Sequence, residues 1–221
     1  MNWNAIVKEL NLSPTVLLLL SGAFAYLCGC FNGAVIVSKY ILRDDVRTHG
    51  SGNAGLTNFF RTFGGALTLV VILLDVVKAI VAVLASVWII DSFLGPESAL
   101  IAKYWAGLAC LLGHMFPCMF DFKGGKGILS GGTIAIMIDW RLALLVWGGF
   151  ILLVALTRYV SLGSVYAAGA FPFGTWFLVS REPAVVALSV VLGALIIWKH
   201  KENIKRLLKG KENKLSFHKK S

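Results

Sequence analysis

Residues 64–90 read GGALTLVVILLDVVKAIVAVLASVWII, and this apolar run determines the class of fold. As a single helix it is long enough to cross the hydrocarbon core of a bilayer, for which about 20 apolar residues suffice. Its only ionisable residues, Asp75 and Lys78, stand three apart and therefore share one helical face. Because ionisable groups are costly in lipid, we expect the pair to face the interior of a helix bundle, either as a structural ion pair or in support of a site.

The composition of the whole chain agrees with a membrane protein. The 221 residues are 57% hydrophobic and 14% charged, and the mean hydropathy of +0.79 is too high for an ordinary soluble domain. We therefore predict an all-α polytopic membrane helix bundle, with a single domain over residues 1–221 and a basic tail at 199–221. The net charge of +10 comes largely from that tail. We expect the tail to meet anionic lipid headgroups and not nucleic acid, and we expect the N-terminus, which lacks a secretory signal, in the mature protein.

Further apolar runs flank this span. One precedes it at about 14–40, with small residues spaced for close helix packing (Gly22, Gly29 and Gly33), and another follows at about 99–116. Shorter apolar pieces lie at 128–138, 142–156, 165–179 and 184–198. If the interruptions at 139–141 and 180–183 are turns, the chain has seven transmembrane helices, and if each pair of pieces is one kinked span, it has five.

We favour seven helices because the polar segments then gather on one side of the membrane. That side also holds most of the 21 Lys and Arg residues. The positive-inside rule places it in the cytoplasm, together with the C-terminus, and leaves the N-terminus outside.

The connection between the first two spans contains HGSGNAGLTNFFR, residues 49–61. Its glycines allow the backbone to approach a ligand closely, and its serine, threonine and asparagines supply uncharged donors. Its arginine adds a planar cationic fork, which suits a phosphate. The alternative is an interhelical connection that is only rich in turn-forming residues. The candidate residues here are Ser51, Gly52, Asn53, Gly55, Asn58 and Arg61.

A second polar segment, GHMFPCMFDFKGGKG at 113–127, precedes an apolar helix that begins at Ile128. Glycines beside lysines at a helix N-terminus are typical of a phosphate cradle, in which backbone N–H groups and the helix dipole meet the anion. The segment is not a Walker A motif, because the four-residue spacer and the Lys-Ser/Thr pair are missing. A basic loop that only sets membrane topology is the alternative. The candidate residues are Lys123, Gly124, Gly125, Lys126 and Gly127.

Two more polar segments follow, RYVSLGS at 158–164 and HKENIKR at 200–206. In the second, His200 and Asn203 share a helical face where the last span meets water, and His200 can accept a proton or orient a nucleophile. Glu202 can orient a neighbour or stay solvated. The alternative is a solvated helix with an incidental histidine. The cysteines are expected to be buried small hydrophobes outside any metal site, namely Cys28, Cys30, Cys110 and Cys118.

Taken in order, four of these segments resemble the acyl-phosphate-dependent glycerol-3-phosphate acyltransferases of bacteria. They are SGNAGLTNFFR (51–61), GHMFPCMFDFKGGKG (113–127), RYVSLGS (158–164) and HKENIKR (200–206). The resemblance extends over nearly the whole chain and includes LLDVVK at 73–78, which is similar to the family's LLDxxK stretch. Departures fall at packing positions, namely Ala54, Leu56, Ile128 and Leu129.

The resemblance implies a seven-helix enzyme of the bacterial inner membrane with its active site at the cytoplasmic face. It would transfer a fatty acyl group from acyl phosphate to the 1-hydroxyl of glycerol 3-phosphate. The products would be lysophosphatidic acid and phosphate, in the first step of phospholipid biosynthesis. No metal or other cofactor is implied, and the expected surroundings are membrane lipids. The acyl-chain preference and the oligomeric state stay open.

The same resemblance implies roles for individual residues. Catalytic roles fall to Ser51, Arg61, Lys123, Lys126, Ser161, His200 and Asn203. Substrate binding falls to Gly52, Asn53, Gly55, Asn58, Gly124, Gly125 and Gly127. Supporting roles fall to Asp75, Lys78, His114 and Glu202. Two other functions stay open at this point, a transporter or channel for an anionic solute and a non-catalytic membrane scaffold with a basic tail.

Overall fold

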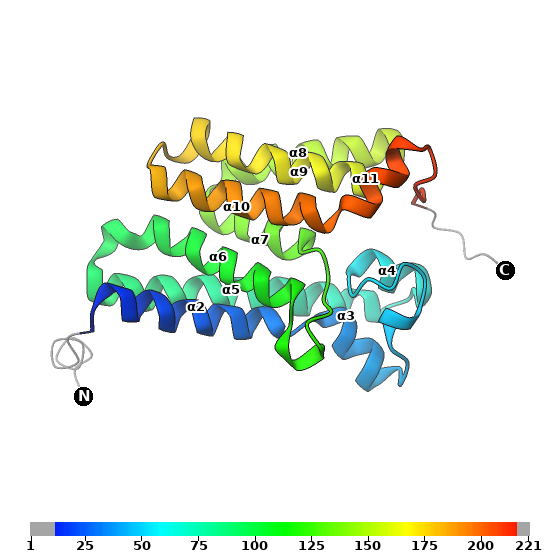
Figure 1. Ribbon diagram of the computed structural model, residues 1–221, viewed down its shortest axis with the longest axis horizontal. Coiled ribbons are helices and arrows are strands. Elements are labelled where there is room, and N and C mark those ends of the chain that lie inside the picture. The colour runs from blue at the N-terminus through cyan, green and yellow to red at the C-terminus, as the bar shows by residue number, and fades with distance from the viewer. Residues whose placement is uncertain (1–11, 216–221) are drawn as a thin grey trace. The chain divides into compact units, whose positions relative to one another are not determined.

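The computed structural model describes residues 12–215, and every regular element within that range is a helix (Figure 1). The predicted all-α class is therefore confirmed. The chain divides into two compact units, Met1–Met137 and Ile138–Ser221, which are described one at a time. The single domain over residues 1–221 stays a prediction, and the last part of the predicted basic tail, residues 216–221, lies outside the described residues.

In the first unit, three long helices pack along one another: α2 (Pro14–Cys30), α5 (Leu67–Leu94) and α6 (Ala99–Met115). The shorter elements are α3 (Gly33–Ile36), η1 (Val37–Ile41), η2 (Val46–Thr48), α4 (Leu56–Thr62), η3 (Pro96–Ser98), η4 (Cys118–Phe120) and α7 (Ile128–Ile138). Most of these connect the long helices. The first two polar segments of the sequence lie largely in these connections.

Glycines set the distance between α2 and α6. A Cβ on Gly29 would overlap the carbonyl oxygen of Cys110, and a Cβ on Gly113 would overlap the carbonyl oxygen of Tyr26. The two helix backbones are thus in direct contact, as the spacing of small residues predicts. The ring nitrogen of Trp105 donates to a carbonyl of α2 at 2.9 Å.

The first apolar run is not one helix. It breaks at residues 31 and 32, and Pro14–Cys30 and Gly33–Ile41 meet at 41°. Asn32 caps the second piece, because its side chain accepts the N–H of Val35 at 3.1 Å. The apolar run at 14–40 is therefore a bent pair of helices that can still count as one span, and the break brings the polar side chain of Asn32 into the bundle.

The second unit consists of α8 (Trp140–Thr157), α9 (Val160–Gly174), η5 (Thr175–Val179), α10 (Pro183–Lys199) and α11 (Lys201–Leu208). Asp139 caps α8 by accepting the N–H of Arg141 at 2.7 Å. Hydrogen bonds from the Arg141 side chain lower the pKa of this carboxyl to about 2. At the other end, Arg158 adopts a left-handed conformation and terminates the helix.

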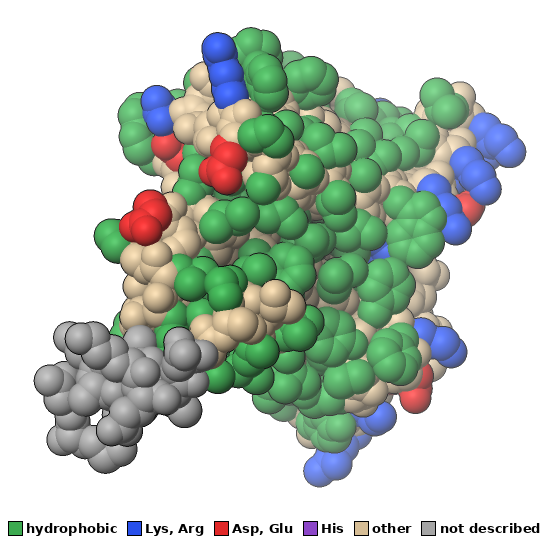
Figure 2. All heavy atoms as spheres, turned by 60° about the vertical axis from the view of Figure 1, so that its left-hand side comes forward, with side chains coloured by type: hydrophobic (Ala, Val, Ile, Leu, Met, Phe, Trp, Pro, Cys, Tyr) green, Lys and Arg blue, Asp and Glu red, His purple; other side chains and the backbone are tan. Residues whose placement is uncertain are grey.

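Large apolar side chains on the long helices of both units point outward, and Figure 2 shows many of them on one face. Four helices are long and apolar enough to cross a membrane, or up to six if each of two bent pairs counts as one span, over the described residues. α7, with 11 residues, is shorter than a span. The helix breaks at residue 139 and at residues 180–182 lie where the sequence predicts interruptions. The chain is thus a multi-pass membrane protein, and its number of spans stays a prediction.

Candidate active site

Loop 1, residues 49–55, takes its shape from the buried side chain of Asn58 in the first turn of α4. The Asn58 side-chain nitrogen donates to the carbonyls of Val46 at 3.1 Å and His49 at 3.0 Å. Its side-chain oxygen accepts the N–H of Ser51 at 3.1 Å. The predicted substrate-binding residue Asn58 is therefore engaged with the backbone of its own loop.

The other predicted residues of this segment are exposed or half-buried at the surface of the protein. Ser51 and Gly52 are exposed, whereas Asn53 and Gly55 are half-buried. Gly52 has φ of +68°, a conformation that glycine adopts without strain. Arg61 is exposed in the last turn of α4. These groups can meet a ligand from solvent or from the membrane surface.

Loop 2, residues 121–127, lies on the end of α6. The N–H of Gly124 donates to Met115 O at 3.2 Å, and the N–H of Gly125 donates to His114 O at 3.1 Å. A Cβ on Gly124 would overlap His114 O, so only glycine permits this approach. The structure thus engages two N–H groups that the sequence assigns to a phosphate cradle. The rest of the cradle is Gly127, the start of α7 and the lysines, of which Lys123 is exposed and Lys126 half-buried.

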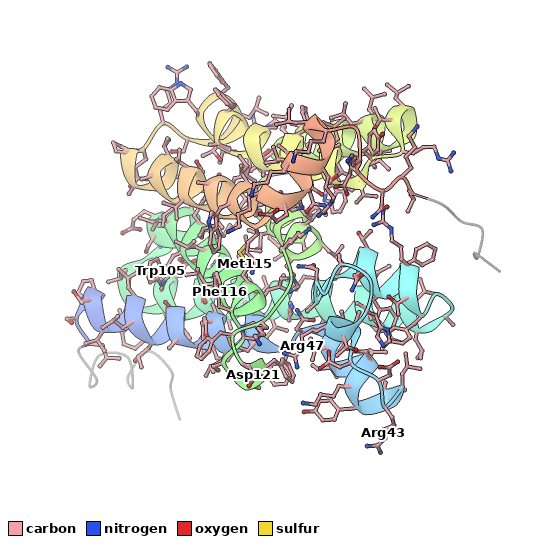
Figure 3. All side chains as sticks on the ribbon, turned by 45° about the vertical axis from the view of Figure 1, so that its right-hand side comes forward. Arg43, Arg47, Trp105, Met115, Phe116 and Asp121 are labelled. Carbon is pink, nitrogen blue, oxygen red and sulfur yellow. The ribbon has the colours of Figure 1, made fainter. Side chains whose placement is uncertain are left out.

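Loops 1 and 2 touch each other. A Cβ on Gly125 would lie 2.7 Å from the carbonyl oxygen of Ala54. Arg47 adds a second connection, because it donates to Phe120 O at 2.8 Å and lies 3.9 Å from Asp121. Figure 3 shows Arg47 and Asp121 near one another on the first unit. The two glycine-rich segments predicted from the sequence are therefore neighbours.

Three of the four predicted supporting residues, Asp75, Lys78 and His114, form a buried cluster. Lys78 Nζ lies 2.7 Å from Asp75 Oδ1 and 2.8 Å from His114 Nδ1. The interior orientation predicted for the Asp75 and Lys78 pair is confirmed by their burial. His114 lies in the last turn of α6, and its carbonyl oxygen accepts the N–H of Gly125 in loop 2.

In the second unit, Ser161 lies in the first turn of α9 and is 5% exposed. Its hydroxyl has no hydrogen-bond partner among residues 12–215. An unsatisfied buried hydroxyl is costly. The Ser161 hydroxyl is therefore available to form a hydrogen bond with a ligand.

His200 and Asn203, predicted to share a face, are both buried where α10 passes into α11. His200 Nδ1 lies 2.8 Å from Ile196 O. Because a carbonyl only accepts, Nδ1 carries a hydrogen, and in the neutral ring Nε2 then has the lone pair. Asn203 donates to Glu212 at 3.1 Å. Glu202 is exposed and pairs with Lys205 at 3.0 Å.

Sequence reasoning missed three polar residues that lie outside these segments but bond to them or beside them. Asn32 donates to Ala54 O at 3.0 Å and so bonds the helix break to loop 1. Arg47 bonds Asp45 and Phe120 O and lies 3.9 Å from Asp121 of loop 2. Glu212 accepts from Asn203 and, at 2.8 Å, from Arg206. The signal available for Asn32 was a polar residue inside an apolar run. Within the described part of the chain, no group of three His, Cys, Asp or Glu side chains could hold a metal ion.

Comparison with known proteins identifies relatives over nearly the whole chain. A family model described as glycerol-3-phosphate acyltransferase matches residues 19–210. A protein of that name from Thermoanaerobacter pseudethanolicus is 38% identical over 197 residues, which cover 89% of this chain and 94% of the relative. One from Shewanella woodyi is 42% identical over 193 residues, which cover 87% of this chain and 90% of the relative.

Two solved structures share the fold. One is the glycerol 3-phosphate form of PlsY, an integral membrane glycerol 3-phosphate acyltransferase, with a TM-score of 0.78, 35% identity and coverage of 90% of this chain and 96% of that chain. The other is the lysophosphatidic acid form, with a TM-score of 0.75 and 34% identity. All four polar segments lie within the range that the family model matches. The chain therefore belongs to the glycerol-3-phosphate acyltransferase family.

Proposed function

We propose that the chain transfers a fatty acyl group from acyl phosphate to the 1-hydroxyl of glycerol 3-phosphate. The products are 1-acylglycerol 3-phosphate and inorganic phosphate. The family match over residues 19–210 carries this proposal. The similarity to a protein solved in a glycerol 3-phosphate form and in a lysophosphatidic acid form supports the acceptor and the product.

The first unit is equipped to bind phosphate. Arg61 presents a planar fork of donors beside loop 1, and Lys123 and Lys126 present ammonium groups at loop 2. The start of α7 adds the positive end of a helix dipole. The N–H groups of Gly124 and Gly125 already donate to carbonyls of α6. We therefore assign the anion to the arginine and lysine side chains and to the start of α7.

The second unit is equipped to handle a hydroxyl group. The lone pair of His200 Nε2 can accept the proton of an attacking alcohol, and the Nδ1 hydrogen bond to Ile196 O fixes the ring for that task. The unpartnered hydroxyl of Ser161 can orient an alcohol or phosphate oxygen. Asn203 contributes a side-chain amide.

The transfer itself needs no covalent enzyme intermediate. The substrate oxygen forms a bond to the acyl carbon while the bond from that carbon to the phosphate oxygen breaks, and the alcohol proton passes to His200. Acyl phosphate is a mixed anhydride with a good leaving group. Positioning and stabilisation of the phosphate charge therefore supply much of the rate.

A direct assay tests the proposal. Membranes containing the protein receive acyl phosphate and labelled glycerol 3-phosphate, and parallel samples receive an acyl thioester donor. We expect labelled lysophosphatidic acid with acyl phosphate only. Product formed from the thioester and not from acyl phosphate would contradict the proposal that acyl phosphate is the acyl donor. Solute uptake without any acylated product would favour a transporter, and neither product nor uptake would favour a scaffold.

Matched variants test the phosphate-binding side chains. Arg61→Ala and Lys126→Ala should each lower kcat/KM by about 100-fold, because each removes a charge-assisted contact. Arg43→Gln and Lys209→Ala remove exposed charges outside the two loops and should have little effect. Unchanged turnover of Arg61→Ala or Lys126→Ala would remove that residue from the site.

We also propose seven spans in the bacterial inner membrane, with the N-terminus outside and the active site at the cytoplasmic face. The distribution of Lys and Arg supports this orientation. In intact cells, Arg181→Cys should react with an impermeant maleimide, because the connection at 180–182 would be external. Lys209→Cys should react only after permeabilisation. Absence of external labelling of Arg181→Cys would contradict the seven-helix topology and favour five spans.

A further inference from the structure

A buried ionic cluster connects the helix break around Asn32 with loop 2 in the first unit. Asp75, Lys78 and His114 are 1%, 6% and 3% exposed. Charges at such depth are costly in a membrane protein, and apolar side chains of similar volume often stabilise a fold equally well. Stability alone is therefore a weak reason for these three residues.

One end of the cluster holds the break between α2 and α3. Asp75 Oδ1 and Lys78 Nζ bond the backbone on either side of Asn32, at 3.2 and 3.1 Å. Asn32 in turn donates to the carbonyl of Ala54 in loop 1 at 3.0 Å. The segment that the cluster fixes is thus bonded directly to loop 1.

The other end of the cluster lies under loop 2. The carbonyl of His114 accepts the N–H of Gly125 at 3.1 Å. A Cβ on Gly125 would overlap His114 Nε2 and lie 2.7 Å from Ala54 O. Gly125 is therefore packed closely against both the imidazole ring and the backbone of loop 1, at the point where the two loops touch.

The contact with Lys78 determines which ring nitrogen of His114 carries the hydrogen. An ammonium group can only donate, so His114 Nδ1 accepts and the ring N–H is Nε2, on the side of loop 2. Asp75 fixes the ammonium group that fixes the ring. The three side chains thus form one ordered chain from α5 to Gly125.

We propose that Asp75, Lys78 and His114 are positioning residues that hold loop 2 against loop 1 and thereby set the affinity for the phosphate of glycerol 3-phosphate. The identity of that ligand rests on the proposed function. The three residues act through Gly125 and Ala54 and do not touch the substrate. Their loss should mainly raise KM for glycerol 3-phosphate and leave kcat within a few-fold.

Kinetics of variants that still fold separate positioning from stability. The double variant Asp75→Leu/Lys78→Met removes both charges together and avoids an unpaired buried charge. We expect it to insert normally and to raise KM for glycerol 3-phosphate by about 10-fold or more. His114→Leu should do the same, whereas His114→Gln, which can place an amide donor near the Nε2 position, should recover part of the affinity.

A control and two outcomes complete the kinetic test. Ser86→Ala alters another buried polar group of α5, bonded to Ser21 O at 3.4 Å, and should leave KM unchanged. An apolar double variant with wild-type KM would overturn the proposal whatever its stability, because the cluster would then be at most a structural ion pair. Equal loss of affinity in His114→Gln and His114→Leu would overturn the role of the Nε2 donor.

Hydrogen exchange separates this proposal from the proposed function. The amides of Gly124 and Gly125 bond to α6, so their exchange without substrate reports the position of loop 2. Exchange at both should be at least about 10-fold faster in His114→Leu than in wild type or Ser86→Ala. Unchanged exchange would overturn the positioning role. If wild-type protein acylated no glycerol 3-phosphate, the proposed function would fail, and exchange alone would decide the role of the cluster.

Discussion

The side-chain oxygen of Asn58 accepts the backbone N–H of Ser51 at 3.1 Å, across seven residues of chain. The same side chain donates to Val46 O and His49 O. One amide in the helix after loop 1 therefore holds the backbone at the start of the loop. We therefore expect Asn58 to stabilise the conformation of loop 1.

Asn58→Ala should destabilise the protein by about 1–3 kcal/mol, because three backbone groups lose their partner. It should also raise KM for glycerol 3-phosphate. Asn58→Asp keeps the acceptor but faces two carbonyl oxygens with a carboxylate, so it should be worse than alanine. Thermal unfolding in detergent and steady-state kinetics measure both effects. Asn53→Ala is the control for stability, and equal unfolding temperatures of Asn53→Ala and Asn58→Ala would contradict the assignment.

Two serines of α9 provide a matched pair for the second unit. Ser161 and Ser164 are 5% and 2% exposed, but Ser164 donates to Val160 O at 2.9 Å, whereas Ser161 has no hydrogen-bond partner in the described chain. Removing an unsatisfied buried hydroxyl should not destabilise the fold. Ser161→Ala should therefore keep or raise the unfolding temperature while losing most turnover. Ser164→Ala should keep turnover, and the opposite pattern would exclude Ser161 from the site.

The Asp45 carboxylate makes the connection between the loops dependent on pH. Hydrogen bonds from Arg47 lower the pKa of this carboxyl, and Arg47 also donates to Phe120 O. A carboxyl whose pKa is lower in the folded state stabilises the fold above its unfolded pKa, about 3.9, and this contribution is lost as the pH falls through the folded pKa.

The unfolding temperature of the wild-type protein should therefore decrease more between pH 5 and pH 3 than that of the Asp45→Asn variant. Asp44→Asn, which removes the neighbouring pair with His49, is the control and should leave the acid dependence due to Asp45 in place. Parallel pH dependence of the wild-type and Asp45→Asn proteins would refute this account of the connection.

His200 should be distinguishable as a base by two conservative variants. His200→Asn can keep the donor to Ile196 O, which Nδ1 supplies now, but has no group at the Nε2 position. His200→Gln can place an amide oxygen near the Nε2 position but cannot take up a proton. If Nε2 is the base, both variants should lose about 100-fold or more in kcat and the corresponding limb of the pH profile. A His200→Gln enzyme with an unaltered pH profile would indicate a hydrogen-bonding role.

The sequence predicted the helical class and the location of the polar segments because these follow from apolar run length and from local composition. It also predicted that Asp75 and Lys78 face the interior, since a charge in lipid needs a partner. It did not predict the break at Asn32. The stretch is apolar on both sides, and the freed backbone groups are satisfied by Lys78 and Asp75, which are distant in sequence.

Loop 2 shows the same limit at the candidate site. Lysines and glycines before a helix predicted a phosphate cradle in which backbone N–H groups meet the anion. Composition could not tell, however, that the N–H groups of Gly124 and Gly125 are bonded to α6. Which donors remain for an anion depends on that path. It also could not place Arg47, whose partners Asp45 and Phe120 lie on different segments.

The contact between α2 and α6 gives a last prediction, because it underlies both the helix break and loop 2. A Cβ on Gly113 would overlap Tyr26 O, and a Cβ on Gly29 would overlap Cys110 O. In each case the obstacle is backbone, which cannot rotate away as a side chain can. Gly113→Ala and Gly29→Ala should therefore push the helices apart and cost several kcal/mol, about as much as severe overpacking of a core.

Gly148 of α8 is the matched control for these two positions. No atom lies within 4 Å of a Cβ placed there, and alanine is the better helix former by about 1 kcal/mol. Gly148→Ala should therefore be neutral or stabilising. Unfolding temperatures in one detergent compare the three variants directly. Because α6 carries His114, a Gly113→Ala protein that still folds should also show a raised KM for glycerol 3-phosphate. A Gly113→Ala protein as stable and as active as Gly148→Ala would show that the backbone contact between α2 and α6 is absent.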